Sequence, residues 1–155
     1  MKRTHGVLAL ALLSAAGAAT AAGAASTVPA AHASRAAIVG VHHSSLGSIL
    51  VSSSGRTLYE FTRDHAGKSS CAAISGCPEA WPPLRTTGKP TARSGVKASL
   101  LSSINLAGGG KQVTYAGHPL YLYAGDSGTA ETSYVGVKEF GGNWYAINAS
   151  GHAVK

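Results

Sequence analysis

The chain has 155 residues and a formal net charge of +7, with 13 lysines and arginines against 6 acidic residues. Once an N-terminal export signal is set aside, this length suits one compact domain and excludes two well-buried ones. Charged residues are only 12% of the chain, against about a quarter in a typical domain. This does not indicate disorder, because tyrosine, tryptophan and aliphatic residues are spread through the chain from Ile38 onward.

Residues 1–33 have the pattern of a signal peptide. Lys2 and Arg3 give a positive start, and an apolar stretch rich in alanine follows. The small residues up to Ala33 suit a signal peptidase, so we expect cleavage after Ala33 and a secreted, extracellular protein. The alternatives are cleavage near Ala25 and an uncleaved membrane anchor, although the strongly apolar part is short for a membrane span.

The chain has only two cysteines, Cys71 and Cys77. Neither follows the signal closely, so a lipid anchor there is excluded, and no later apolar run is long enough for a membrane helix. In an exported chain the two are expected to form a disulfide. Closing so short a loop contributes on the order of 2 kcal/mol. A metal-binding or redox pair is the alternative, although the spacing is not Cys-x-x-Cys.

The first elements are expected to be strands. Residues 34–45 hold a flexible start and a strand at Ile38–His42. A second strand, Leu46–Ser53, is followed by the turn Ser53–Gly55. Because the chain then returns as the apolar and aromatic segment Arg56–Thr62, we expect a β-hairpin.

Residues 85–107 are expected to form a basic connector. From Arg85 to Lys111 the chain carries five cations and no acid. Its first half is rich in Thr, Gly, Pro and Ser, which predicts a loop. Ala98–Ile104 is expected to form a short helical turn. The cations fit either a solvated connector or a polyanion site.

A second hairpin follows a glycine turn at 108–110. We expect a strand at Lys111–Tyr115, a turn at Ala116–Gly117 and a return strand at His118–Ala124. The last two strands are joined by a turn at Gly141–Gly142 and are expected at Tyr134–Val137 and Trp144–Ile147.

The chain contains an internal repeat: Gly55–Asp64 recurs as Gly117–Asp126, with Gly, Leu, Tyr, a second aromatic residue and Asp in the same order. An internal repeat determines the architecture before any single motif does. We therefore predict an all-β fold of two pseudo-equivalent β-meander repeats packed as one small domain, with one disulfide inside a loop. Repeat 1 is expected to cover 46–84 and repeat 2 to cover 108–155.

The repeated aromatic residues lie two apart on a strand, so each pair shares a face. The pairs are Tyr59 with Phe61 and Tyr121 with Tyr123. They fit either core packing or an aromatic floor for a flat ligand or sugar. Glu60, between the first pair, points the other way and is expected to face solvent.

Asp64 and Asp126 end the two copies of the block. An aspartate just past a strand commonly accepts hydrogen bonds from backbone N–H groups of a turn. A paired acid site, or oxygen ligands for a cation, is the alternative. Trp81 and Trp144 hold corresponding places in the two copies and are expected to seal the two ends of the core.

Four histidines fit either a solvated surface or an opportunistic copper or zinc site: His42, His43, His65 and His118. Adjacent histidines on a strand point to opposite faces, so the first two cannot chelate there as a unit. The chain lacks Gly-x-Ser-x-Gly, a phosphate-binding glycine loop and His-Glu-x-x-His. We therefore expect no catalytic site, no metal site and no cofactor.

The chain resembles a bacterial secreted-repeat family described as predicted lipoproteins with a Tyr-x-(Phe/Trp/Tyr)-x-x-Asp motif. The resemblance covers Leu46–Ile147, and the motif occurs twice, as Tyr59, Phe61 and Asp64 and as Tyr121, Tyr123 and Asp126. Many members resemble lipoproteins, whereas this chain lacks the lipid-bearing cysteine, so free secretion is expected rather than anchoring. The family implies no particular activity.

We expect a non-catalytic extracytoplasmic protein, an envelope-associated or polyanion- and glycan-binding module. Its expected partner is an anionic cell-envelope polymer rather than nucleic acid, and its expected state is a monomer. The alternatives are a metal-binding or redox accessory protein and a hydrolase that uses Asp64 and Asp126. Function is expected where the copies differ, as at Glu60 against Leu122 and in the loop between Cys71 and Cys77.

Overall fold

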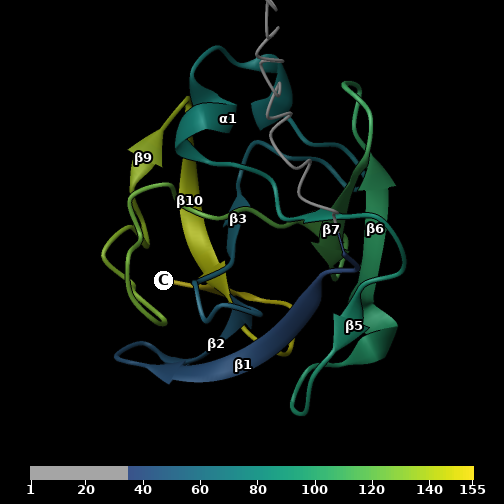
Figure 1. Cartoon of the computed structure of the whole chain (residues 1–155). Helices are drawn as coiled ribbons and strands as arrows, with labels where there is room; N and C mark the ends of the chain where they lie inside the picture. Colours follow the sequence, from purple (N-terminus) through teal and green to yellow (C-terminus); the bar gives the residue numbers. More distant parts are fainter. Residues whose placement is uncertain (1–34) are drawn as a thin grey trace, which may run out of the picture. The chain divides into compact units, whose positions relative to one another are not determined.

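Figure 1 shows the computed structural model, which describes residues 35–155. The expected signal peptide, 1–33, and its cleavage site lie outside this range. Strands dominate, and the helical segments of the described residues are α1 (Cys77–Ala80) and the 3-10 turns η1 (Cys71–Ala73) and η2 (Ala98–Leu100). No helix within 35–155 has the length and apolar character needed to span a membrane. The all-β expectation is confirmed.

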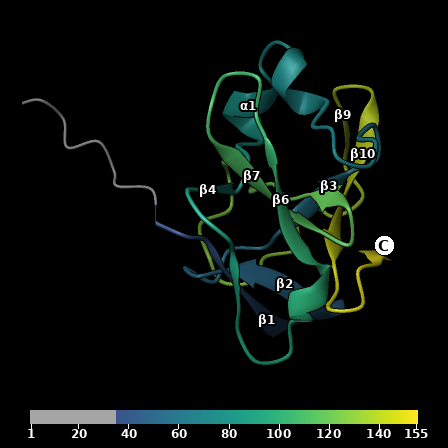
Figure 2. The same cartoon turned by 90° about the vertical axis from the view of Figure 1, so that its right-hand side faces the viewer.

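One sheet has the strand order β2-β1-β5. Its members are β1 (Ile38–Ser44), β2 (Gly47–Ser52) and β5 (Thr91–Ala92). β2 forms a full hairpin with β1, before it in the chain, and pairs with the segment after it, as expected, only near the turn between them. The hairpin lies at the opposite end of the domain from α1 in both views (Figures 1 and 2).

A second sheet has the order β4-β7-β6, with β8 also paired to β7. Its strands are β4 (Arg85–Thr86), β6 (Leu101–Asn105), β7 (Lys111–Tyr115) and β8 (His118–Pro119). The helical turn expected at Ala98–Ile104 ends at Leu100, and the rest of it is β6. Residues 85–107 are therefore more than a connector, because β4, β5 and β6 all lie within them.

The third sheet joins the two copies of the repeat. β3 (Tyr59–Phe61) pairs with β10 (Gly142–Ile147), and β10 also pairs with β9 (Lys138–Glu139) and β11 (Ala153–Val154). The expected return strand of the first copy thus finds its partner in the second copy. Its pairing with β2 is limited to a bridge between Val51 and Thr57 and nearby backbone bonds.

Two tight turns in the second copy use adjacent residues with positive φ. They are Ala116 at 49° with Gly117 at 86°, and Phe140 at 52° with Gly141 at 80°. Type I′ hairpin turns need positive φ at both central residues, which a glycine at the second position makes easier. The expected turn at Ala116–Gly117 is confirmed, and the last hairpin turns one residue earlier than expected.

The two copies are interleaved around a pseudo-twofold relationship between Tyr59 and Tyr121. The backbone N–H of each donates to the carbonyl oxygen of the other, both at 2.9 Å. On the outer side of Tyr59 lies Ala146 of the second copy, and on the outer side of Tyr121 lies Pro83 of the first. The last extended segment of each copy therefore pairs with the motif segment of the other.

The leucine and the tyrosine of each repeated block pack in different clusters of the core. Successive residues of a strand point to opposite faces. Leu58 and Leu120 belong to an aliphatic cluster with residues such as Val113, whereas Tyr59 and Tyr121 belong to an aromatic cluster. The motif segments are therefore buried on both faces, which explains why they carry large apolar residues in succession.

Candidate functional site

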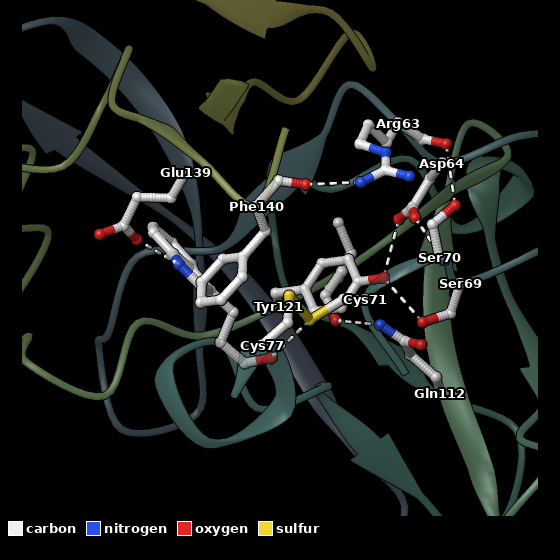
Figure 3. Close-up of a disulfide and its surroundings, with 12 residues drawn as sticks. Arg63, Asp64, Ser69, Ser70, Cys71, Cys77, Gln112, Tyr121, Glu139 and Phe140 are labelled. Carbon is white, nitrogen blue, oxygen red and sulfur yellow. Dashed lines mark hydrogen bonds between the residues drawn. A yellow bond between two sulfur atoms is a disulfide. The ribbon is translucent and has the colours of Figure 1, made fainter. Parts of the chain in front are cut away.

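The tyrosine of each motif donates its hydroxyl proton to the aspartate of the other motif. Tyr121 Oη lies 2.8 Å from Asp64 Oδ2, and Tyr59 Oη lies 3.1 Å from Asp126 Oδ2. The first of these bonds is drawn in Figure 3. The residues of each motif are close together in the sequence, but each motif tyrosine bonds the aspartate of the other copy. The two hydrogen bonds are therefore long-range contacts that join the copies.

The two aspartates lie in separate networks. Asp64 also accepts the backbone N–H of Ser70 at 2.6 Å, while Asp126 lies near Glu131 and Arg56. Burial raises the pKa of both carboxyls, and the tyrosine hydroxyl that each accepts lowers it in part. Asp64 bonds a backbone N–H of the following loop, as a turn aspartate is expected to do, and its tyrosine partner could not be read from the sequence.

Three aromatic rings form a continuous stack between the copies, in the order Phe61, Trp144, Trp81. The two tryptophan rings lie 3.9 Å apart between centroids and 2° from parallel, and the Phe61 ring lies 4.1 Å from that of Trp144. The Tyr123 ring lies 4.7 Å from that of Trp81 but is tilted by 45°, and it contacts the ring of Tyr134 in turn. The expectation that the tryptophans seal opposite ends of the core was wrong, because they stack on each other in one cluster of it.

The motif aromatics pack in the core and do not form an open floor. Tyr59, Phe61 and Tyr121 are each 2% exposed or less, and Tyr123 is half-buried. Burial raises the pKa of Tyr59 and Tyr121, and the neighbouring carboxylates raise it further. Both hydroxyls therefore remain protonated donors at neutral pH.

The expected disulfide between Cys71 and Cys77 is present, and both residues are fully buried. It closes the loop that carries η1 and the start of α1. The loop is anchored at its entrance by the bond from the Ser70 N–H to Asp64 and by a bond from the Ser70 hydroxyl to the Arg63 carbonyl. The second copy has no disulfide-closed loop, so this loop distinguishes the first copy of the repeat from the second.

Beside this loop runs a groove, which we call the loop groove. It lies between the disulfide loop and the tip of the β6–β7 hairpin, and consists of two adjoining hollows that share Ser69, Ala72 and Leu106. The inner hollow has a volume of about 170 Å³. Further groove residues include Lys68, Pro78, Pro83, Arg85, Asn105 and Tyr121.

Sequence reasoning did not find the loop groove. Its walls come from segments about 35 residues apart in the chain, near Ala72 and near Leu106. Two parts of the groove could be identified in the sequence, the disulfide loop and the glycine-rich turn at 108–110. What brings them together is the pairing of β4 with β7, which was not expected.

Glu60 is buried at 7% exposure, so the expectation that it faces solvent was wrong. Its equivalent in the second copy, Leu122, packs against the aliphatic cluster. Glu60 Oε2 instead lies 3.2 Å from Nδ1 of His118. Burial raises the pKa of the Glu60 carboxyl, His118 and Lys155 lower it in part, and Asp64 raises it.

The structure does not gather the four histidines into a metal site. Within residues 35–155, no three side chains of the His, Cys, Asp and Glu types are close enough together to hold a metal ion. His42 and His43 are exposed neighbours on β1, and Nδ1 of His42 bonds the His43 carbonyl. His65 and His118 line a shallow hollow with Asp64.

A family model described as a secreted repeat of unknown function (Lipoprotein_15) matches residues 40–85 and 102–148. The matches cover more than half of the chain, and the second begins at β6, the counterpart of β1 in the first. No curated protein and no solved structure matches the chain. The resemblance seen in the two Tyr-x-aromatic-x-x-Asp motifs is confirmed: the chain belongs to this family of secreted repeats and carries two copies of the repeat.

Proposed function

We propose that this protein is a non-catalytic extracytoplasmic binding module that holds an anionic polymer of the cell envelope. The observation that carries the proposal is an imbalance of solvent-facing charge. Of the eleven lysines and arginines in residues 35–155, ten are exposed, whereas Glu79 is the only one of six acidic residues that is exposed. A surface with one dominant sign of charge attracts polymers of the other sign.

The acidic side chains are engaged inside the domain. Asp64 and Asp126 accept tyrosine hydroxyls, and Glu60 pairs with His118. The carboxylate of Glu139 accepts the indole N–H of Trp81 at 3.0 Å, and that of Glu131 accepts the Ser127 N–H. These five carboxylates are less exposed than the cations, so the charged groups that a polymer meets at the surface are mainly lysines and arginines.

The motif residues support a scaffold role rather than catalysis. Tyr59 and Tyr121 are buried and donate to carboxylates that lie in two separate networks. A paired-acid hydrolase needs two carboxyl groups on either side of one substrate bond, at most about 10 Å apart. The tyrosine–aspartate hydrogen bonds between the copies give the motif residues a structural role, so no hydrolytic reaction is needed to explain the motif.

The test is retention of the purified protein on immobilised anionic polymers. Poly(glycerol phosphate) and polygalacturonate serve as phosphate and carboxylate probes, and dextran is the neutral control. We expect retention on at least one anionic polymer at low salt, with affinity that falls steadily as salt rises, because exposed charges are screened within about 10 Å at 0.1 M. Absence of retention at low salt, or equal retention on dextran, would contradict the proposal.

A charge variant makes the test sharper. Lys89, Arg93 and Lys97 are exposed in the basic segment between the hairpins. Changing all three to glutamine should lower the salt concentration needed for elution. Changing the exposed neutral residues Ser94 and Ser99 to glutamine is the matched control and should leave elution unchanged. Equal behaviour of the two variants would mean that exposed charge does not drive binding.

A further inference from the structure

The loop groove combines apolar walls with positive charge and contains no acidic side chain. The prolines Pro78 and Pro83 and the side chain of Leu106 provide apolar surface, while Arg85 and Lys68 provide the charge. Sites for drug-sized ligands are typically about 300 Å³ or more. The inner hollow, at about 170 Å³, is suited to a single small unit rather than to a long ligand.

Arg85 is oriented toward this groove before any ligand binds. Its Nη1 donates to the carbonyl of Gly109 at 3.2 Å. A Cβ added to Gly110 would lie 3.1 Å from the same Nη1, so the guanidinium lies close against the backbone of the hairpin tip. One hydrogen bond leaves most of the five guanidinium N–H donors available, in the planar arrangement that binds phosphate and carboxylate groups.

Ser69 supplies a hydrogen-bond acceptor in the same groove. Its Oγ lies 2.7 Å from Oη of Tyr121, whose own proton is donated to Asp64 (Figure 3). Because an ionised carboxylate can only accept, the proton between Ser69 and Tyr121 must come from Ser69. The Ser69 oxygen then has a lone pair free to accept a hydroxyl of a ligand.

We propose that the loop groove binds one anionic, hydroxyl-bearing unit of the polyol-phosphate or uronic-acid type. The guanidinium of Arg85 binds the anionic group, Lys68 adds positive charge at the outer hollow, and Ser69 accepts a hydroxyl. This inference rests on the proposed function, because the unit is a repeat or an end of the anionic polymer. It goes further by giving the polymer one defined subsite, on the copy that carries the disulfide loop.

The test titrates small probes into the full-length exported protein and follows backbone amide signals by NMR at low salt. The probes are glycerol 1-phosphate and glucuronate, with glycerol and glucose as neutral controls and inorganic phosphate as the control without an alcohol hydroxyl. We expect saturable shifts at Ser69, Ala72 and Leu106 with at least one anionic probe. The probe that binds tells a phosphate source from a carboxylate source.

Two variants separate the groove from general charge. Arg85→Gln should weaken binding about tenfold or more, since a hydrogen bond to a charged group is among the stronger ones. Arg93→Gln removes the same charge outside the groove and should weaken it less than about twofold. Ser69→Ala should weaken glycerol 1-phosphate but not inorganic phosphate. Unchanged thermal unfolding of each variant shows that the fold is intact.

Several results would overturn the subsite. These are equal shifts of the same amides by the neutral probes, equal weakening of binding by Arg85→Gln and Arg93→Gln, and no binding of any small probe. If polymer retention persists in any of these cases, the subsite is wrong and the surface-charge proposal stands. If a small probe occupies the groove while no polymer is retained, the groove is supported and the polymer proposal is wrong.

Discussion

Tyr121 donates its hydroxyl proton to Asp64 over 2.8 Å, from the second copy of the repeat to the first. The equivalent bond runs the other way, from Tyr59 to Asp126. Neither tyrosine bonds the aspartate of its own motif through its hydroxyl. The Tyr-x-aromatic-x-x-Asp motif therefore describes half of a reciprocal contact, and a single copy on its own would leave its tyrosine and aspartate without these partners.

The two motif aspartates should differ in their contribution to stability. Asp64 accepts both the Ser70 N–H and the Tyr121 hydroxyl, whereas Oδ1 of Asp126 has no hydrogen-bond partner among the described residues. Tyr59 also has a second acceptor, the Glu131 carbonyl at 3.3 Å. We expect Asp64→Ala to cost about 3 kcal/mol and Asp126→Ala about 1 kcal/mol. Urea unfolding of the two variants measures this, and the reverse order would contradict it.

The protein should lose stability as the pH rises from acid to neutral. Burial raises the pKa of Glu60, Asp64 and Asp126. The folded chain therefore binds these protons more tightly than the unfolded chain does. Their stabilising effect is complete below the ordinary carboxyl pKa of about 4 and is lost as the pH rises through the raised values. The midpoint of urea unfolding across this range measures the effect.

Glu60→Gln is the matched variant for this pH dependence. Glutamine keeps an acceptor for His118 and removes the buried ionisable group. We expect this variant to be more stable than the parent at neutral pH and to show a shallower fall with rising pH. A parent protein that gains stability as the pH rises, or a variant with the parent's slope, would show that the burial of these carboxyls is not what sets the profile.

The disulfide should resist reduction while the protein is folded. Both cysteines are fully buried, so a thiolate cannot reach either sulfur without local opening. We expect slow reduction by dithiothreitol in buffer and fast reduction in urea, measured by alkylation and mass spectrometry. Changing both cysteines to serine should lower the free energy of unfolding by about 2 kcal/mol. Fast reduction of the native protein would contradict the burial of the bond.

The sequence was sufficient to predict the elements that depend on local signals. The duplicated block predicted a two-repeat β fold, the export context predicted the Cys71–Cys77 disulfide, and the small residues at Ala116–Gly117 predicted a tight turn. Each of these rests on residues close together in the chain. Such features can be predicted because the residues within the turn and within the short loop determine their conformation.

The sequence was insufficient where pairing joins distant segments. An apolar segment such as Tyr59–Phe61 shows that it will be a buried strand, but not that its partner is Trp144–Ala146. For the same reason Glu60 was expected in solvent. In the fold it is buried, and His118 of the second copy lies against its carboxylate. The stack of Trp81 on Trp144 also depends on how the copies interleave, which no local pattern reveals.

A double-mutant cycle on Tyr121 and Asp64 tests the reciprocal contact between the copies most directly. The cycle compares Tyr121→Phe, Asp64→Ala and the double variant, and a control cycle pairs Tyr121→Phe with Asp126→Ala, the aspartate of its own motif. We predict a coupling of about 1 kcal/mol for the first pair and additivity within about 0.5 kcal/mol for the second. Additivity between Tyr121 and Asp64, with coupling between Tyr121 and Asp126, would contradict the interleaved arrangement.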